Sequence, residues 1–270
     1  MGLYSIIGAG GFVGSHLVTH LTRGGHECQA IYRRDPLPRR LGHAIYCVGV
    51  SNKAKPMHLI NAHVSTLSRV LQCSSFDSFT YLSSTRVYQY NSPKNAVTEA
   101  ANLTLNPANP SDLFNISKIA GESLCLSFPQ ENIRVVRLSN VYGPNDKSNN
   151  FLTAILRQVL TLGRATIVNG LNSCKDYIDV QDVMMALENI PIRASSRIIN
   201  VATGRNVSNR KIISIIKSQT GVIVDVRQDL PEVRFPVIAI DRLIKETGVR
   251  PRAFTKGFPA LIKCMRAQLL

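Results

Sequence analysis

The sequence predicts an α/β fold built on a doubly wound parallel sheet. Apolar, strand-like runs alternate with helical patterns, which favours βαβ units. The first of these units carries three spaced glycines between its strand and its helix. A chain of 270 residues can also bury a full core. We therefore expect one large α/β domain with a smaller annex.

The first unit is an apolar strand, Leu3–Ile7, that runs into glycines and then a helical pattern. Gly8 permits a tight turn, Gly11 lets the backbone approach a pyrophosphate, and Gly14 lets the helix lie close to its strand. The start of that helix would then offer free N–H groups to the anion. Glycine spacing alone also fits an ordinary strand-to-helix turn.

The remaining elements continue the alternation. Strands are expected over residues 27–32, 44–50, 79–83, 133–138, 198–201 and 222–226. Helices are expected over residues 56–73, 111–126, 151–162, 180–189 and 208–221, with two short helices near the C-terminus. Ser111 and Ser208 are the predicted caps of their helices.

The alternation of strand-like and helical segments becomes less regular beyond Pro144. We predict a nucleotide-binding domain over residues 1–145 and a small mixed α/β part that binds substrate over residues 146–270. Residues 180–201 are expected to return to the first domain, so the two parts interleave.

The formal net charge is +15, and it is concentrated late in the chain. Residues 1–190 hold 17 Lys and Arg against 12 acids, whereas residues 191–270 hold 15 against 5. Such a surplus can bind nucleic acid, coat a solvated surface or attract an anionic small molecule. No nucleic-acid motif accompanies it, so nucleic acid is not the expected partner.

Other classes of protein are disfavoured as well. The sequence contains no run of eighteen apolar residues, so we expect no membrane span. The first strand begins at once, which leaves no room for a signal peptide. Six cysteines without CxxC spacing suit reduced thiols in a cytoplasmic protein. Metal-ligand spacing, a Ser/His/Asp triad and a Walker A motif are absent from the sequence.

Six ordered segments are recognisable together. They are GAGGFVG (8–14), YLSSTRVY (81–88), FNISK (114–118), RLSNVYGP (137–144), KDYIDVQDV (175–183) and AIDRLIKETGVRPR (239–252). This set resembles the extended short-chain dehydrogenase/reductase family, the NAD(P)-dependent epimerase/dehydratase group. The resemblance implies a Rossmann-like fold and hydride chemistry at a secondary alcohol, most often on a sugar nucleotide. It also implies a homodimer.

The resemblance implies catalytic roles for three positions. In the family a tyrosine removes the hydroxyl proton, and a lysine binds the nicotinamide ribose and lowers the tyrosine pKa. A serine or threonine hydrogen-bonds the forming carbonyl oxygen. Ser84 takes the serine position and Lys118 the lysine position, although a capping hydroxyl and a solvated helix lysine are the alternatives. The tyrosine position holds Phe114, which has no ionisable hydroxyl.

Phe114 should weaken the ordinary reaction, because general acid–base catalysis contributes about 10²–10⁴-fold. Either another group substitutes, the reaction needs no such base, or the protein is no longer a dehydrogenase. Tyr88 and His63 are conceivable substitutes, but a core or loop role is expected for both. Lys118 with a depressed pKa is the other candidate.

The acid that normally ends the second strand is replaced by Tyr32, followed by Arg33 and Arg34. An arginine beside the ribose favours a 2′-phosphate, so we expect NADP rather than NAD. A pair of solvated arginines is the alternative. The predicted cofactor-binding residues are Gly8, Gly11, Phe12, Val13, Gly14, Tyr32, Arg33, Arg34, Gly49 and Lys118.

Only about ten residues separate Arg34 from the next strand, and a right-handed crossover needs about a dozen or more. We therefore expect the family's third strand to be absent or vestigial, which makes the second strand a sheet edge. Pro36, Pro38, Arg39 and Arg40 are expected to guard that edge against pairing.

The predicted substrate-binding residues are Thr85, Asn140, Asn149 and Lys175. The family often contacts a sugar-nucleotide phosphate at the position of Asn140, and Lys175, Arg157 and Arg205 offer charge for a diphosphate. Two functions remain open. One is an NAD(P)-dependent epimerase, dehydratase or reductase with modified acid–base machinery, acting on a sugar nucleotide or similar secondary alcohol. The other is a weakened or inactive dinucleotide-binding sensor or scaffold.

Overall fold

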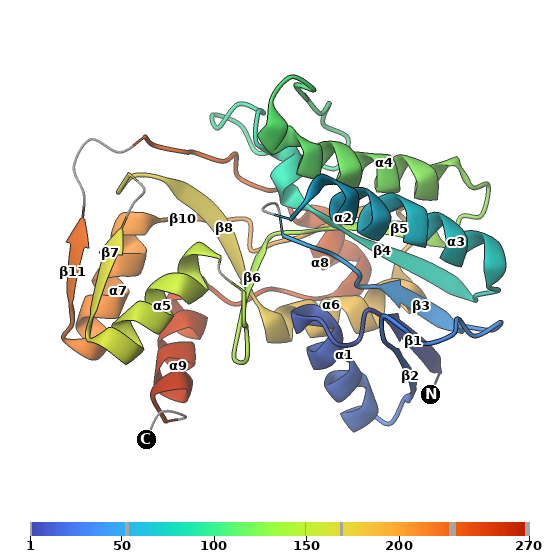
Figure 1. Ribbon diagram of the computed structural model, residues 1–270, viewed down its shortest axis with the longest axis horizontal. Helices are drawn as coiled ribbons and strands as arrows, with labels where there is room; N and C mark the ends of the chain where they lie inside the picture. Colours follow the sequence, from blue (N-terminus) through green and yellow to red (C-terminus); the bar gives the residue numbers. More distant parts are fainter. Residues whose placement is uncertain (1, 52–53, 149, 168–169, 227–230, 268–270) are drawn as a thin grey trace.

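The computed structural model describes residues 2–51, 54–148, 150–167, 170–226 and 231–267. Its main feature is a parallel sheet of order β2-β1-β3-β4-β5-β9 (Figure 1). The strands are β1 (Leu3–Ile7), β2 (Glu27–Ile31), β3 (His43–Tyr46), β4 (Ser78–Ser84), β5 (Ile133–Leu138) and β9 (Ile198–Val201). The chain first moves outward from β1 to β2 and then reverses through β3. This order confirms the predicted doubly wound α/β class.

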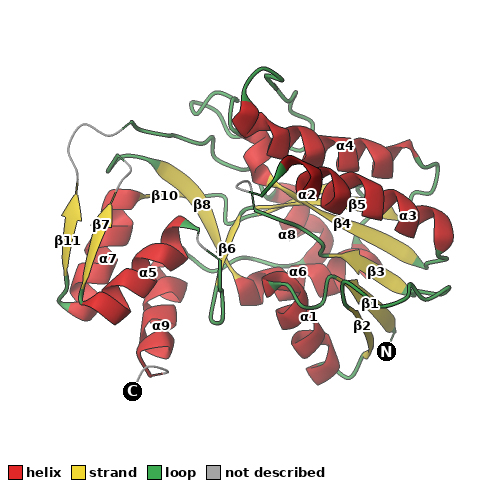
Figure 2. Cartoon of the chain, viewed as in Figure 1, coloured by secondary structure: helices red, strands yellow, loops and turns green. Residues whose placement is uncertain are grey.

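Helices cover both faces of this sheet, as Figures 1 and 2 show. One layer is α1 (Phe12–Arg23), α6 (Val180–Arg193) and α8 (Asp241–Thr247). The other is α2 (Pro56–Ile60), α3 (Thr66–Cys73) and α4 (Leu113–Ser127), with a π-helical turn, Asn61–Ser65, between α2 and α3. Side chains alternate along β1, so successive residues point to opposite faces of the sheet. Ile6 packs in the core on the α1 side, and Ile7 packs in the core on the opposite face.

The second part of the molecule has its own core. Its strands form a sheet of order β10-β8-β6 and a two-stranded pair, β11-β7. These elements are β6 (Asn140–Tyr142), β7 (Arg164–Ile167), β8 (Cys174–Asp179), β10 (Asn206–Ser208), β11 (Ile223–Val226), α5 (Phe151–Leu162), α7 (Asn209–Thr220) and α9 (Phe254–Ala267). The division at residue 145 stays a prediction. Within the described chain, β9 lies in the large sheet and α6 packs on α1.

The connection from β2 to β3 is short, and residues 32–41 contain no strand beyond a single bridge. β2 is therefore an edge strand, as predicted. For Pro38, Arg39 and Arg40 the expected guarding of that edge is wrong, however, whereas for Pro36 it stays a prediction. Ser75 N–H donates to the Arg39 carbonyl at 2.8 Å and Ser74 Oγ to that of Pro38 at 3.0 Å. These bonds hold the segment beside the start of β4 instead.

Several boundaries differ from the expected ones. β3 ends at Tyr46, the residue that pairs with the last residue of β1, Ile7, although β4 on its other side continues to Ser84. Ser111 does not cap α4. Its N–H instead donates to Asn109 Oδ1 at 3.0 Å, within a 3₁₀ turn, Pro110–Asp112. The cap at Ser208 is confirmed, α6 continues to Arg193, and α9 is longer than expected.

Candidate active site

The glycine loop joins β1 to α1 at the point where the winding of the sheet reverses. Gly8 has φ 91°, and a Cβ on Gly14 would lie 2.4 Å from the Gly8 carbonyl oxygen. Both positions therefore require glycine. Gly11 is the N-cap of α1 and provides no side-chain cap, so the helix start that holds Phe12 and Val13 suits an anion. The tight loop and the uncapped helix fit a dinucleotide pyrophosphate.

Tyr32, Arg33 and Arg34 lie exposed directly after β2. The Tyr32 ring lies beside the loop, because its Cδ1 atom would be 3.4 Å from a Cβ on Gly10. Sequence reasoning did not single out Asp35, whose Oδ2 accepts the Tyr32 N–H at 2.9 Å. The carboxylate that lies near this strand end thus closes a turn.

Ser84 ends β4, and Phe114 and Lys118 lie one turn apart on α4. The Ser84 Oγ atom accepts the Arg86 N–H at 3.2 Å, so the hydroxyl does cap the following turn. Lys118 is only 5% exposed, and its Nζ donates to the Leu82 carbonyl at 2.8 Å. The alternative of a solvated helix lysine is therefore wrong.

Burial lowers the pKa of Lys118 to about 7, while Glu122 and Cys47 act in the opposite direction. Glu122 is committed elsewhere, since its Oε2 lies 2.6 Å from Arg137 Nη2 and its Oε1 accepts from Ser83 Oγ. Lys118 therefore has no ion-pair partner in the described chain, and its charge costs free energy. Such an amine can exchange a proton near neutral pH.

His63 lies behind Phe114, with their ring centroids 5.6 Å apart. Ser117 Oγ donates to the Phe114 carbonyl, which leaves Nδ1–H of His63 to donate to Ser117 Oγ at 2.8 Å. Its Nε2 is buried without a hydrogen bond. Burial first, and Lys118 second, lower the pKa of His63 to about 3. His63 is thus neutral at pH 7 and a poor substitute for the missing base.

Gly49 lies next to these groups. A Cβ there would be 3.9 Å from Lys118 Nζ and 4.0 Å from His63 Nε2. Tyr88 lies apart from them, fully buried, and its hydroxyl donates to Asn200 Oδ1 and accepts from Arg137 Nη1 at 2.7 Å. Tyr88 therefore has the core role that the sequence favoured.

A cavity of about 760 Å³, called here the Phe114 cavity, brings several predicted residues together. Its lining includes Ser84, Thr85, Phe114, Asn140 and Lys175. The lining also includes residues that sequence reasoning missed, among them Arg86, Gln158, Tyr177 and Phe235. Asn149 lies outside the described residues. The nearness of Arg86 to Ser84 in the chain was the available signal for that residue.

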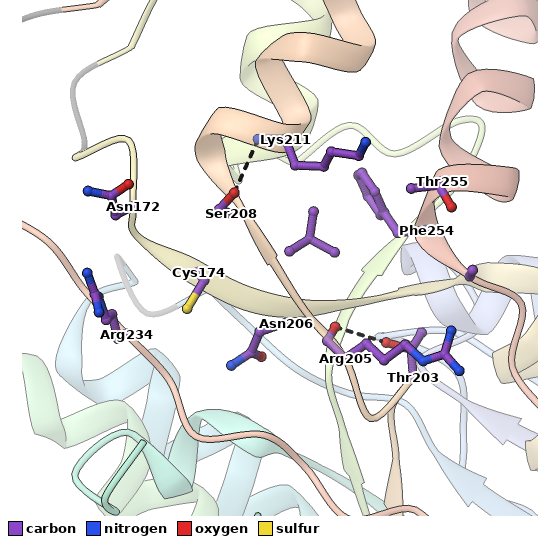
Figure 3. A pocket seen from close by; sticks show the side chains of 12 residues that line it. Asn172, Cys174, Thr203, Arg205, Asn206, Ser208, Lys211, Arg234, Phe254 and Thr255 are labelled. Carbon is purple, nitrogen blue, oxygen red and sulfur yellow. Dashed lines mark hydrogen bonds between the residues drawn. The ribbon is translucent and has the colours of Figure 1, made fainter. Parts of the chain in front are cut away.

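A second cavity of about 550 Å³, called here the Lys211 cavity, lies on the other face of β8 (Figure 3). Cys174 lines this cavity and Lys175 the Phe114 cavity, as alternation along a strand requires. Arg205 and Arg234 also line it. The expectation that Arg205 joins Lys175 is therefore wrong. Arg157 is not in either lining, and its Nη2 donates to the Ser148 carbonyl at 3.3 Å.

No helix among the described residues is long and apolar enough to cross a membrane. Those residues also contain no cluster of three or more His, Cys, Asp or Glu that could hold a metal. The doubly wound sheet and its glycine loop are those of a dinucleotide-binding protein of the short-chain dehydrogenase class. The model of the NAD dependent epimerase/dehydratase family matches residues 42–202, and the chain belongs to this family.

Relatives and solved structures agree with this assignment. The GDP-6-deoxy-D-mannose reductase of Pseudomonas aeruginosa is 27% identical over 264 residues, covering 85% of this chain and 84% of that protein. A dTDP-glucose 4,6-dehydratase of Streptomyces griseus is 24% identical over 120 residues, covering 43% and 36%. Such relatives support an enzyme of the family's type.

Two solved structures share the fold. RMD from Pseudomonas aeruginosa, complexed with NADPH, has a TM-score of 0.83 at 22% identity and covers 99% of this chain and 100% of its own. MoeE5, in complex with UDP-glucose and NAD, has a TM-score of 0.82 at 21% identity and covers 100% of both chains. The bound cofactors of these neighbours are consistent with NAD(P).

Proposed function

We propose that this chain is an NAD(P)-dependent epimerase, dehydratase or reductase of sugar nucleotides with its acid–base machinery altered at Phe114. The observation that carries the proposal is a single cavity lined by Ser84, Phe114, Asn140 and Lys175. Ser84 lies at the carboxyl end of its strand, the edge where open α/β sheets bind ligands. The sugar-nucleotide names of the relatives support the substrate class.

Each residue has a distinct proposed role. Ser84 donates a hydrogen bond to the reacting oxygen, and Lys175 attracts the diphosphate. Lys118 holds or releases a proton at Nζ, since its pKa lies near neutrality. A bound nicotinamide supplies the site that accepts or donates hydride. Gly8, Gly11 and Gly14 shape the loop that would hold its pyrophosphate, and Gly49 leaves space beside Lys118.

We propose NADP rather than NAD, because Arg33 and Arg34 lie exposed where a 2′-phosphate would be read. Titration followed by nicotinamide fluorescence should show NADPH binding more tightly than NADH. Arg33→Ala should narrow the difference in affinity between the two cofactors. Arg39→Ala, a change at another exposed arginine beside the start of β4, should not. Equal affinities in the wild type, or no binding of either, would overturn the cofactor proposal.

A second function, a catalytically weakened dinucleotide sensor or scaffold, is favoured by Phe114 itself. The phenyl ring cannot transfer a proton, and His63 is neutral and Tyr88 is hydrogen-bonded in the core. The turnover of the Phe114→Tyr variant distinguishes the two functions. A rise in turnover supports the enzyme, and a variant that binds both ligands but remains inactive supports the sensor or scaffold. Whichever of the two functions holds, the homodimer and the cytoplasmic location remain proposals.

A further inference from the structure

Arg86 lies in the wall of the Phe114 cavity, two residues after Ser84. Its backbone N–H donates a hydrogen bond to Ser84 Oγ, and its guanidinium carbon lies 6.0 Å from the centre of the Phe114 ring. The side chain therefore lies over the ring that replaces the family's tyrosine. Arg86 thus lies at the end of the cavity that Ser84 and Phe114 line.

Within the part of the chain that the structure describes, the charge of Arg86 has no carboxylate partner. Its Nε is also buried without a hydrogen bond to any described residue. Asp112 is the acid that acts on it, but Asp112 accepts instead from Gln89 Nε2, the Tyr90 hydroxyl and Asn106 N–H. Burial lowers the pKa of Arg86, as expected for a desolvated cation.

Lys175 is a second cation of the same cavity. Its Nζ lies 5.4 Å from the centre of the Phe235 ring, and burial together with the charge of Arg86 lowers its pKa. The described lining contains no Asp or Glu. Two half-buried cations that repel each other cost free energy unless an anion joins them. The cavity is therefore suited to an anionic ligand, and a ligand with two negative groups would pair both cations.

The diphosphate of a sugar nucleotide is one of these groups, and it suits Lys175 as proposed above. Arg86 remains at the end where Ser84 and Phe114 meet the reacting sugar. We propose that Arg86 is a specificity residue that selects sugar nucleotides whose sugar carries a carboxylate, such as a uronic acid. The planar guanidinium matches a carboxylate in two parallel hydrogen bonds. This inference rests on the proposed function.

Calorimetric titration in the presence of NADP⁺ tests it with two matched pairs, UDP-glucose with UDP-glucuronate and GDP-mannose with GDP-mannuronate. The acidic member of at least one pair should bind about 10–100-fold more tightly, the range expected for hydrogen bonds to a charged group. Arg86→Gln should remove this preference and leave the affinity for the neutral member nearly unchanged. Lys211→Gln, in the other cavity, is the matched control and should change neither.

Arg86→Lys keeps the charge but loses the planar fork, so its preference should fall between wild type and Arg86→Gln. It also decides the question if Arg86→Gln does not fold. Equal binding of both members by the wild type would overturn the proposal, and so would a preference that survives in both variants. An equal loss for both members would place Arg86 on the diphosphate, which also contradicts it. Failure of the proposed function looks different, because then no member of either pair binds.

Discussion

The two cavities on opposite faces of β8 differ in how they hold their positive charge. In the Phe114 cavity, Arg86 and Lys175 are half-buried and unpaired within the described chain. In the Lys211 cavity, Lys211 and Arg205 are exposed, and Arg234 pairs with Glu232 at 3.0 Å. Water screens exposed charge at little cost, whereas buried charge needs a partner. A net charge of +15 therefore does not by itself locate a ligand.

The backbone shows the same contrast. At the Lys211 cavity, the first N–H groups of α7 are already used. Asn209 donates to the Ser173 carbonyl and Arg210 to that of Leu171. Lys211 donates to Ser208 Oγ, a bond that Figure 3 shows. The start of α1, in contrast, has no side-chain cap. Free donors, rather than a helix start alone, distinguish an anion site from a structural turn.

The largest expected effect is on catalysis at Phe114. Phe114→Tyr restores a phenol one helical turn from Lys118, so turnover should rise about 10²–10⁴-fold, the usual contribution of general acid–base catalysis. The measurement is the steady-state rate with NADP(H) and a sugar nucleotide that binds. Alcohol oxidation by the Phe114 protein should increase with pH through about 7, because Lys118 must lose its proton to act as a base.

Phe128→Tyr, the same change at a residue that follows α4, is the control and should not alter turnover. A wild type that is already active and loses activity as Phe114→Tyr would show that the chemistry dispenses with the phenol. A variant that binds both ligands and remains inactive would favour the sensor or scaffold function.

An intermediate effect is expected from removing one cation on each face of β8. Lys175→Gln should weaken sugar-nucleotide binding about 10–100-fold, because a hydrogen bond to a charged group contributes about 1.5–3 kcal/mol. Lys211→Gln should leave the affinity unchanged, since Lys211 is exposed and lines the other cavity. Titration calorimetry measures the affinity of both variants for the sugar nucleotide. Equal losses of affinity would show that the two faces of β8 are equivalent and would contradict the contrast between the cavities.

The sequence predicted the parts of the fold that depend on local pattern. The spaced glycines after the first strand predicted the turn from β1 into α1, and the short connection after Arg34 correctly made β2 an edge. The segment around Arg39 was placed wrongly because its pairing with Ser75 joins residues about 35 positions apart. No local periodicity contains that contact.

The candidate site divides in the same way. Ser84, Phe114 and Lys175 were predictable because each belongs to one of the ordered sequence segments. The structure places all three in the lining of one cavity. Charge alone could not separate Arg205 from Lys175, since the side of the sheet depends on pairing of β10 with β8. The proposed role of Arg86 rests on the absence of an ion-pair partner among the described residues, which its position two residues after Ser84 could not predict.

The smallest expected effect tests the structural role of the Lys211 cavity. Ser208→Ala removes the acceptor for Lys211 N–H at the start of α7, and loss of such a cap costs about 1 kcal/mol of the free energy of unfolding. Ser218→Ala, at an exposed serine late in α7 that bonds the Ile215 carbonyl, is the matched control and should cost less. Urea denaturation measures both variants, and the affinity for the sugar nucleotide should not change in either. A loss of affinity in Ser208→Ala at unchanged stability would instead make this cavity a binding site, because its hydroxyl would then act on ligand rather than on the helix.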